Sequence, residues 1–177
     1  MKLYVVLAGL QASAALTQSV AAAEADGWSE VAAVLRHPRC MNCHTVTDFP
    51  RQGDDRHRHQ QLVLRGAEGK GAATLQCAAC HQSANSHDGK VPGAPNWHLA
   101  PLSMGWEGLN EAQLCNALKD RKKNGDRDLQ KLAEHMTGDA LVQWAWAPGA
   151  RAAPPVTQAA FHAAVQRWVS AGGACPP

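Results

Sequence analysis

Two copies of the pattern Cys-x-x-Cys-His constrain this chain more than any other feature of its sequence. The first copy is Cys40-Met41-Asn42-Cys43-His44 and the second is Cys77-Ala78-Ala79-Cys80-His81. This pattern is the attachment signature of c-type haem. Two thiols at this spacing reach the two vinyl positions of one porphyrin, and the following His is then held beneath the ring with a nitrogen on the iron. The sequence therefore predicts two covalently bound haem c groups, attached through Cys40, Cys43, Cys77 and Cys80, with His44 and His81 as the proximal iron ligands.

Two other uses of paired cysteines explain the pattern less well. A zinc site made from two Cys-x-x-Cys pairs already has its four ligands and leaves His44 and His81 without a role. A thioredoxin-like redox pair needs no second copy of the motif. Haem attachment accounts for both cysteine pairs and for both histidines.

The first residues of the chain predict export. Met1-Lys2 is a positively charged start, residues 3–16 are mostly apolar, and Ala21-Ala22-Ala23 offers a small-residue cleavage site. An uncleaved membrane anchor is the alternative, but Gln11 and Ser13 interrupt a run that is shorter than the roughly 20 apolar residues of a membrane span. We expect residues 1–23 to be a signal peptide and residues 24–177 to form a single domain in the periplasm, with no membrane span after cleavage.

Charge and cysteine count narrow the class further. The chain has 17 Lys and Arg against 15 Asp and Glu, so nothing in its charge suggests a nucleic-acid partner. Cys115 and Cys175 are surplus to the two motifs, and in an oxidising compartment they are expected to form a disulfide with each other. Two free buried thiols are the alternative. Such a bridge stabilises the fold by about 4 kcal/mol on a chain-entropy argument.

Apolar residues recur at helical spacing in several segments, which predicts an all-α fold of c-type cytochrome-like helices and long loops. The expected helices are 28–35, 111–119 capped by Asn110, 129–136 capped by Asp128, 140–146, and a last one that begins at Thr157 and ends before Gly172-Gly173. The segments 48–71 and 83–108 are irregular, and no strand-length alternation competes with the helices. Because the short stretch between the motifs lacks a helical period, we expect the two haems to lie close together in one protein shell.

The sixth ligand of each iron decides whether a haem carries electrons or binds a small molecule, and His and Met are the candidates. His57 and His59 lie in a charged loop between the motifs, and Met104 lies in an irregular loop after the second motif. We expect one haem to be His/His, with His59 or its neighbour His57, and the other to be His/Met, with Met104. A solvated loop and a core methionine are the plain alternatives for these residues. His98 and His135 are the alternative distal ligands.

With these residues in view, the chain resembles a family of small exported dihaem cytochromes c, the cytochrome subunits that accompany molybdenum hydroxylases of the isoquinoline 1-oxidoreductase type. The resemblance covers nearly the whole chain after residue 23. The segments that carry it are 39–44, 53–55 with His57 and His59, 97–101, 114–115 with 118–120, and 173–176. The resemblance implies that the protein accepts electrons from a periplasmic molybdenum-containing dehydrogenase and delivers them to the respiratory chain.

The sequence favours an electron-transfer protein over an enzyme, because it contains no second catalytic constellation beside the haem motifs. We predict no catalytic residue. The alternative is a haem enzyme, or a sensor of gas or peroxide, with one five-coordinate haem. A basic cluster, Lys119, Arg121, Lys122, Lys123 and Arg127, is either a docking surface for an acidic redox partner or a solvated loop.

Overall fold

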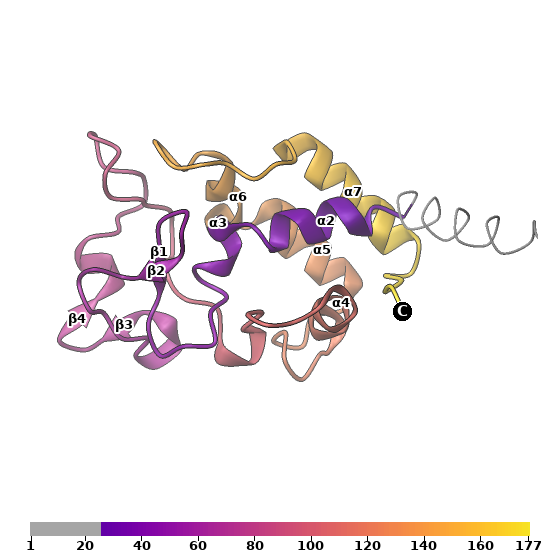
Figure 1. The fold of residues 1–177 in the computed structure, drawn as a ribbon, viewed down its shortest axis with the longest axis horizontal. Helices are drawn as coiled ribbons and strands as arrows, with labels where there is room; N and C mark the ends of the chain where they lie inside the picture. Colours follow the sequence, from indigo (N-terminus) through magenta and orange to yellow (C-terminus); the bar gives the residue numbers. More distant parts are fainter. Residues whose placement is uncertain (1–25) are drawn as a thin grey trace, which may run out of the picture.

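The structure is a computed structural model and describes residues 26–177. The expected signal peptide, residues 1–23, lies outside the described residues. Most of the helices gather at one end of the molecule, and irregular chain with short hairpins forms the other end (Figure 1). Among residues 26–177, no helix is both long enough and apolar enough to cross a membrane.

The helical end is built around the contact of the first and last described helices. The helices are α2 Trp28–Leu35, α3 Pro38–Met41, α4 Glu111–Lys119, α5 Leu129–Gly138, α6 Ala140–Gln143 and α7 Gln158–Ser170. Helix α7 packs against α2 and α5, and α4 packs against α2. Trp28 and Trp168 meet across the α2–α7 contact with ring centres 5.4 Å apart, and Trp168 and Phe161 are fully buried. This core forms one wall of the larger of two cavities described below.

The helices begin where their capping residues predict. Asn110 and Gln113 form a complete capping box at the start of α4, with the Asn110 side chain accepting from the Gln113 amide over 2.8 Å. Asp128 accepts from the Lys131 amide at the start of α5, and Thr157 accepts from the Ala160 amide at the start of α7. Helix α5 runs two residues beyond the predicted end, to Gly138, after which Asp139 caps α6. The predicted last part of the 140–146 helix is a 3₁₀ turn, Trp144–Trp146.

Two hairpins were not predicted. Strand β1 (Arg51–Gln52) pairs with β2 (His57–Arg58), and β3 (Gly71–Ala72) pairs with β4 (Leu75–Gln76), both antiparallel. Each strand has two residues, which is too short to show the alternation from which strands are predicted. Single 3₁₀ turns at Ala67–Gly69, Cys77–Ala79 and Leu102–Met104 punctuate the remaining loops. The all-α class therefore stays a prediction, although the predicted helices are present.

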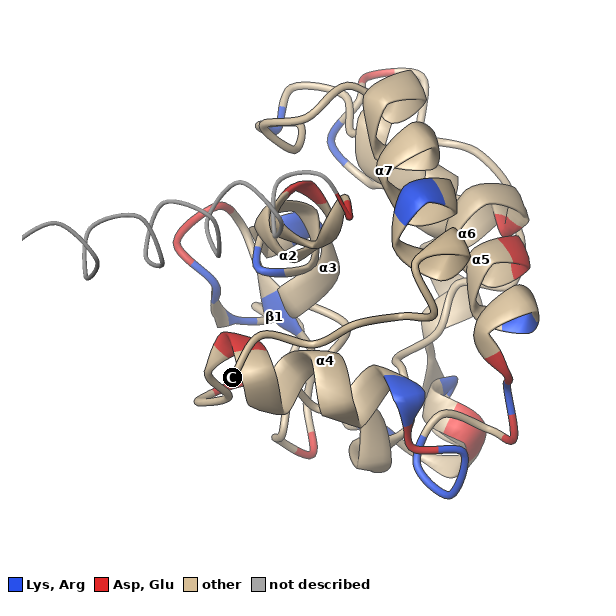
Figure 2. Ribbon diagram, turned by 90° about the vertical axis from the view of Figure 1, so that its right-hand side faces the viewer, with Lys and Arg blue, Asp and Glu red and all other residues tan. Residues whose placement is uncertain are grey.

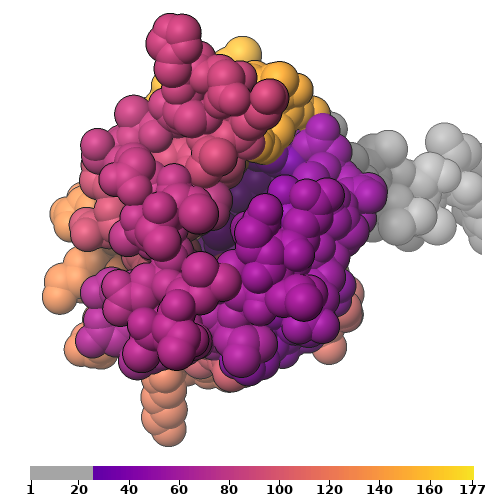
Figure 3. All heavy atoms as spheres, turned by 90° about the vertical axis from the view of Figure 1, so that its left-hand side faces the viewer, coloured from indigo at the N-terminus to yellow at the C-terminus, as the bar shows by residue number. Residues whose placement is uncertain are grey.

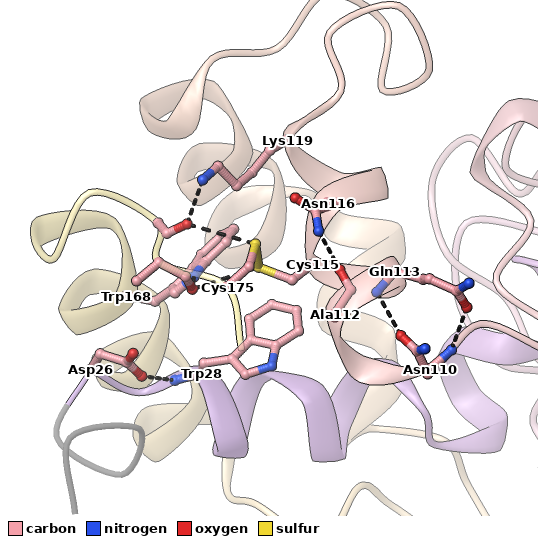
Figure 4. Close-up of a disulfide and its surroundings, with 12 residues drawn as sticks. Asp26, Trp28, Asn110, Ala112, Gln113, Cys115, Asn116, Lys119, Trp168 and Cys175 are labelled. Atoms are coloured by element: carbon pink, nitrogen blue, oxygen red, sulfur yellow. Dashed lines mark hydrogen bonds between the residues drawn. A yellow bond between two sulfur atoms is a disulfide. The ribbon is translucent and has the colours of Figure 1, made fainter. Parts of the chain in front are cut away.

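The predicted bridge between Cys115 and Cys175 is present, with the two Cα atoms 5.6 Å apart. It fastens α4 to the C-terminal tail (Figure 4). Lys119 donates to the Gly173 carbonyl over 2.7 Å, and the Trp168 indole donates to the Ala174 carbonyl over 2.9 Å. The tail is thus held to both α4 and α7.

Charged residues are spread over the helices and loops, and several cations follow α4 (Figure 2), while the side chains of Arg39 and Arg65 are buried. Within this basic cluster, Arg121 pairs with Asp126 over 2.7 Å, and Lys123 lies 4.0 Å from Asp120. Arg127 donates to the Asn124 carbonyl. Local partners therefore occupy much of the cluster, which supports the solvated-loop interpretation over the docking surface.

Candidate haem-binding sites

The first motif folds as a helical turn that continues α3. His37 caps α3 by accepting from the Arg39 amide over 3.3 Å, and Pro38 occupies the first helical position. The amides of Cys43 and His44 both donate to the Cys40 carbonyl, at 3.1 and 3.0 Å. This turn brings Cys40, Cys43 and His44 to the wall of one cavity, here called the His44 cavity.

The second motif also turns back on itself. It begins with the 3₁₀ turn Cys77–Ala79, and the His81 amide donates to the Cys77 carbonyl over 2.9 Å. Cys77 and His81 line a second cavity, here called the His81 cavity. Cys80 is exposed and lines neither of these two cavities.

Each motif histidine is oriented by a backbone carbonyl. The Nδ1 atom of His44 lies 2.8 Å from the Met104 carbonyl oxygen, and the Nδ1 atom of His81 lies 2.7 Å from the Pro92 carbonyl oxygen. A carbonyl oxygen only accepts, so Nδ1 carries the proton and Nε2 keeps its lone pair. Metal-binding histidines are usually held in this way, with one nitrogen on a protein acceptor and the other on the metal.

A tryptophan stacks on each of these imidazoles. Trp106 covers His44 with ring centres 3.4 Å apart, and Trp97 covers His81 with ring centres 4.6 Å apart, both nearly parallel. Burial lowers the pKa of His44 to about 3 and outweighs the Met104 carbonyl contact, which raises it. Burial also lowers the pKa of His81. Both imidazoles are therefore neutral at pH 7, which is the form that binds metal.

The two cavities are large and adjacent. Together with the open solvent at its mouth, the empty space of the His44 cavity is about 1090 Å³ and that of the His81 cavity about 770 Å³. Arg39, Cys43 and His98 line both cavities. On the face shown in Figure 3, the molecule is hollowed between the purple chain of the first motif and its following loop and the pink chain after the second motif.

In the His81 cavity, His59 faces the motif histidine. The ring centres of His59 and His81 are 6.0 Å apart, at an interplanar angle of 68°. Metal–imidazole bonds are about 2 Å long, so two imidazoles on opposite sides of one metal have ring centres about 6 Å apart. His57 instead is exposed, does not line this cavity, and places Nδ1 at 2.6 Å from Asp55 Oδ1. Of the two predicted alternatives, the geometry favours His59.

The other predicted distal candidates line the His44 cavity. They are Met104, His98 and His135, and the neighbouring Met136 lines it too. The Met104 carbonyl contacts Nδ1 of His44, which puts the main chain of Met104 on the same side as the motif imidazole. His135 has Nδ1 at 3.3 Å from Asp139 Oδ2, which leaves its Nε2 free. The geometry therefore favours the other three side chains over Met104 as a ligand opposite His44.

The cysteines of the first motif suit a neutral sulfur better than a thiolate. All four are unpaired in the structure, and the described disulfide joins two other cysteines. Burial raises the pKa of Cys40 to about 12 and that of Cys43 to about 11. Zinc requires deprotonated thiolates, which these surroundings disfavour. A thioether carries no charge and has no such cost.

The residues that line the two cavities also suit an anionic cofactor. Within the described chain, no Asp or Glu lines the His81 cavity, whereas Arg39, Arg51 and Arg151 do. In the His44 cavity, the buried Trp106 indole N–H has no partner among residues 26–177. A haem brings two propionate carboxylates, which accept from such donors. The motif cysteines, the motif histidines and the arginines of the cavity walls thus fit the predicted haems.

Sequence reasoning missed the stacked Trp97 and Trp106 and the buried Arg39. Their positions depend on tertiary contacts, because Trp106 lies far from His44 in the chain and reaches it only once the loop 83–108 has folded. Arg39 adjoins the first motif, but its spacing gives no sign of burial. No signal in the sequence separated these residues from ordinary core and surface positions.

Among residues 26–177, no three His, Cys, Asp or Glu side chains converge to hold a metal ion by themselves. A haem iron takes four ligands from its porphyrin, so it needs at most two from the protein. No protein-family model, no curated protein and no solved structure matches the chain.

Proposed function

We propose that this chain is an exported dihaem cytochrome c that passes electrons between redox partners. One observation carries the proposal: the histidines of both Cys-x-x-Cys-His motifs have the same surroundings. Each has Nδ1 on a backbone carbonyl, a tryptophan stacked on its ring, and a cavity beside it that a cysteine of its own motif also lines. Haem attachment explains this repetition, whereas separate structural roles for His44 and His81 would not require it.

In this proposal, Cys40, Cys43 and His44 hold one haem, and Cys77, Cys80 and His81 hold the other. Each haem supplies one-electron chemistry at its iron when bound. The protein fixes the tautomer of each proximal imidazole through the Met104 and Pro92 carbonyls. Trp97 and Trp106 fix the ring orientations and exclude water from one face of each imidazole.

The residues that line each cavity are the candidates for the sixth ligand of each proposed haem iron. We assign His59 to the haem at His81, because their separation suits two imidazoles on one iron. The Gln61 amide donates to Nδ1 of His59 over 3.3 Å, and this long contact has to give way for ligation through Nε2. For the haem at His44, the candidates are His98, His135 and Met136 ahead of Met104.

The partner of this electron-transfer protein is, in the same proposal, a periplasmic molybdenum-containing dehydrogenase, and the respiratory chain is the acceptor. The support is the resemblance carried by the motif segments. The neighbouring cavities suit such a relay, because an electron that enters at one haem has a short path to the other.

The electronic spectrum of the purified reduced protein tests this function. Two six-coordinate low-spin haems are expected, with no change on adding carbon monoxide. A protein without haem bands would contradict the proposal.

A second candidate is a haem enzyme or a sensor of small molecules, with an open position at the His44 haem. One observation favours it: within the described residues, no second imidazole faces His44 in the way that His59 faces His81. Carbon monoxide would then shift about half of the Soret absorbance. The same titration therefore separates the two candidates.

A further inference from the structure

Arg39 is a buried cation at the boundary of the two cavities. Its side chain is 2% exposed, and it lines both the His44 cavity and the His81 cavity. Within residues 26–177, the hydrogen bonds of its side chain come from Nη2 alone, to the Gly53 carbonyl over 3.1 Å and to the Asp54 carboxylate. Nε is buried and has no partner in this part of the chain. Leaving a buried donor unsatisfied destabilises the folded state, so a missing acceptor is expected beside it.

The only carboxylate that pairs with Arg39 in the described chain lies toward solvent. Asp54 is 53% exposed on its side chain and also accepts from the Ala152 amide over 3.4 Å. Water screens the negative charge of Asp54 more strongly than the buried positive charge of Arg39. Arginine stays protonated in proteins, so a net positive potential reaches both cavities from this one residue.

The other charged residues act on one side only: Arg51 and Arg151 line the His81 cavity, whereas Arg127 and Asp139 line the His44 cavity. Arg151 lines the His81 cavity but not the His44 cavity, and it donates to the carbonyls of Gly89, Pro148 and Lys90 rather than to a carboxylate. Arg39 is therefore distinguished from Arg151 by its place on both walls.

We propose that Arg39 is a shared positioning residue for both haems. It offers its free donors to haem propionates and raises the reduction potentials of both irons together. Asp54 is the counter-charge that limits this rise. This inference rests on the proposed dihaem function. A ferric haem carries one more positive charge than a ferrous haem, so a nearby cation disfavours the oxidised state and raises the potential. Removing the positive charge of Arg39 must therefore lower both potentials, whereas removing the negative charge of Asp54 must raise them.

Spectroelectrochemical titration of the full exported protein tests the proposal, with haem content measured by mass spectrometry on the same samples. Arg39→Gln is expected to lower both midpoint potentials, and Asp54→Asn is expected to raise both. Arg39→Lys, which keeps the charge, is expected to restore most of the wild-type values. Arg36→Gln is the matched control, because Arg36 is exposed, lies three residues before Arg39 at the end of α2, and lines neither of the two cavities.

A shift of only one potential in Arg39→Gln, or no shift, would overturn the shared role. Shifts of the same sign in Arg39→Gln and Asp54→Asn would show a structural disturbance in place of a charge effect and would also overturn it. If Arg39→Gln yields no protein with two haems, Asp54→Asn decides: a rise in both potentials supports the proposal, and any other result contradicts it. A wild-type chain without two haems would instead refute the proposed function itself.

Discussion

His44 and His81 each have Nδ1 on a backbone carbonyl and a tryptophan stacked on the ring. A third histidine, His59, lies across the cavity from His81. The motif spacing alone predicted His44 and His81. It left His57 and His59 as alternatives, because both lie in the same charged loop. The β1–β2 hairpin separates them: His57 lies in β2 beside Asp55, while His59 follows the strand and turns into the cavity.

Replacing His59 should therefore affect one haem only. In His59→Ala, we expect one of the two haems to become high-spin, because within the described chain no other imidazole faces His81 at a comparable distance. Electron paramagnetic resonance of the oxidised protein measures this change. His57→Ala is the control, two residues away, and should keep both haems low-spin. A low-spin spectrum in His59→Ala would remove this residue from the ligand set.

Met104 offers a sharper test of the distal side at His44. The contact to His44 is made by the Met104 backbone carbonyl, so Met104→Leu keeps it. We expect this variant to keep the wild-type spectrum of both haems, whereas either Met136→Leu or His135→Gln should disturb one haem. Loss of a thioether charge-transfer band in Met104→Leu alone would restore the His/Met assignment that the sequence predicted.

Among the structural elements, most of the helices were predictable, but the short helix α3 and the hairpins were not. Asn110, Asp128 and Thr157 mark helix starts because their side chains satisfy free amides, and this signal is local. The hairpins β1–β2 and β3–β4 form where the chain bends around the sites, and two residues per strand leave no pattern. The loop 83–108 brings Trp97, Trp106 and the carbonyls of Pro92 and Met104 to the motif histidines. Their positions could not be predicted, because they depend on contacts between segments that lie far apart in the sequence.

The disulfide links α4 to the C-terminal tail, and neither of its cysteines lines the His44 cavity or the His81 cavity. In Cys115→Ser with Cys175→Ser, we expect a loss of about 4 kcal/mol in the free energy of unfolding, on the chain-entropy argument. The melting temperature should fall by roughly 10 °C for a chain of this size. Thermal unfolding followed by circular dichroism measures this. The haem spectrum of the folded variant is the control and should stay as in the wild type.

Glu107 joins the segment after the first motif to the loop before α4. It accepts from the Val46 amide and the Thr45 hydroxyl, both over 3.1 Å, and pairs with Arg51 and Arg56. Burial alone would raise the pKa of this carboxyl, but these hydrogen bonds and arginines outweigh it, so the pKa is lowered from 4.5. Because the folded-state pKa is below the unfolded one, the ionised Glu107 stabilises the fold above pH 4.5, and this contribution is lost as the pH falls through the folded-state value.

Glu107→Gln should therefore cost about 1–3 kcal/mol at pH 7 and should make the stability less dependent on pH below 4.5. Urea unfolding at several pH values measures both effects. Glu111→Gln, at an exposed position at the start of α4, is the matched control. Equal pH dependence in the wild type and in Glu107→Gln would contradict this role.

For the whole molecule, the two motifs lie close together in the chain, and the cavities beside their histidines adjoin each other. The two cavities share Arg39, Cys43 and His98, so whatever binds in one lies beside the other. Helical periodicity does not reveal this arrangement, because neither cavity is formed by a single element. The sequence predicted the two motifs and their proximity, and the structure adds the common wall between them.

The account depends on covalent haem at both motifs, and the intact mass of the exported protein tests this most directly. We expect a mass equal to the processed chain plus two haems, retained after denaturation because thioether bonds hold them. Cys77→Ala with Cys80→Ala should lose one haem and keep the other at Cys40 and Cys43. A chain exported and folded with no haem adduct, or with only one, would contradict the central claim.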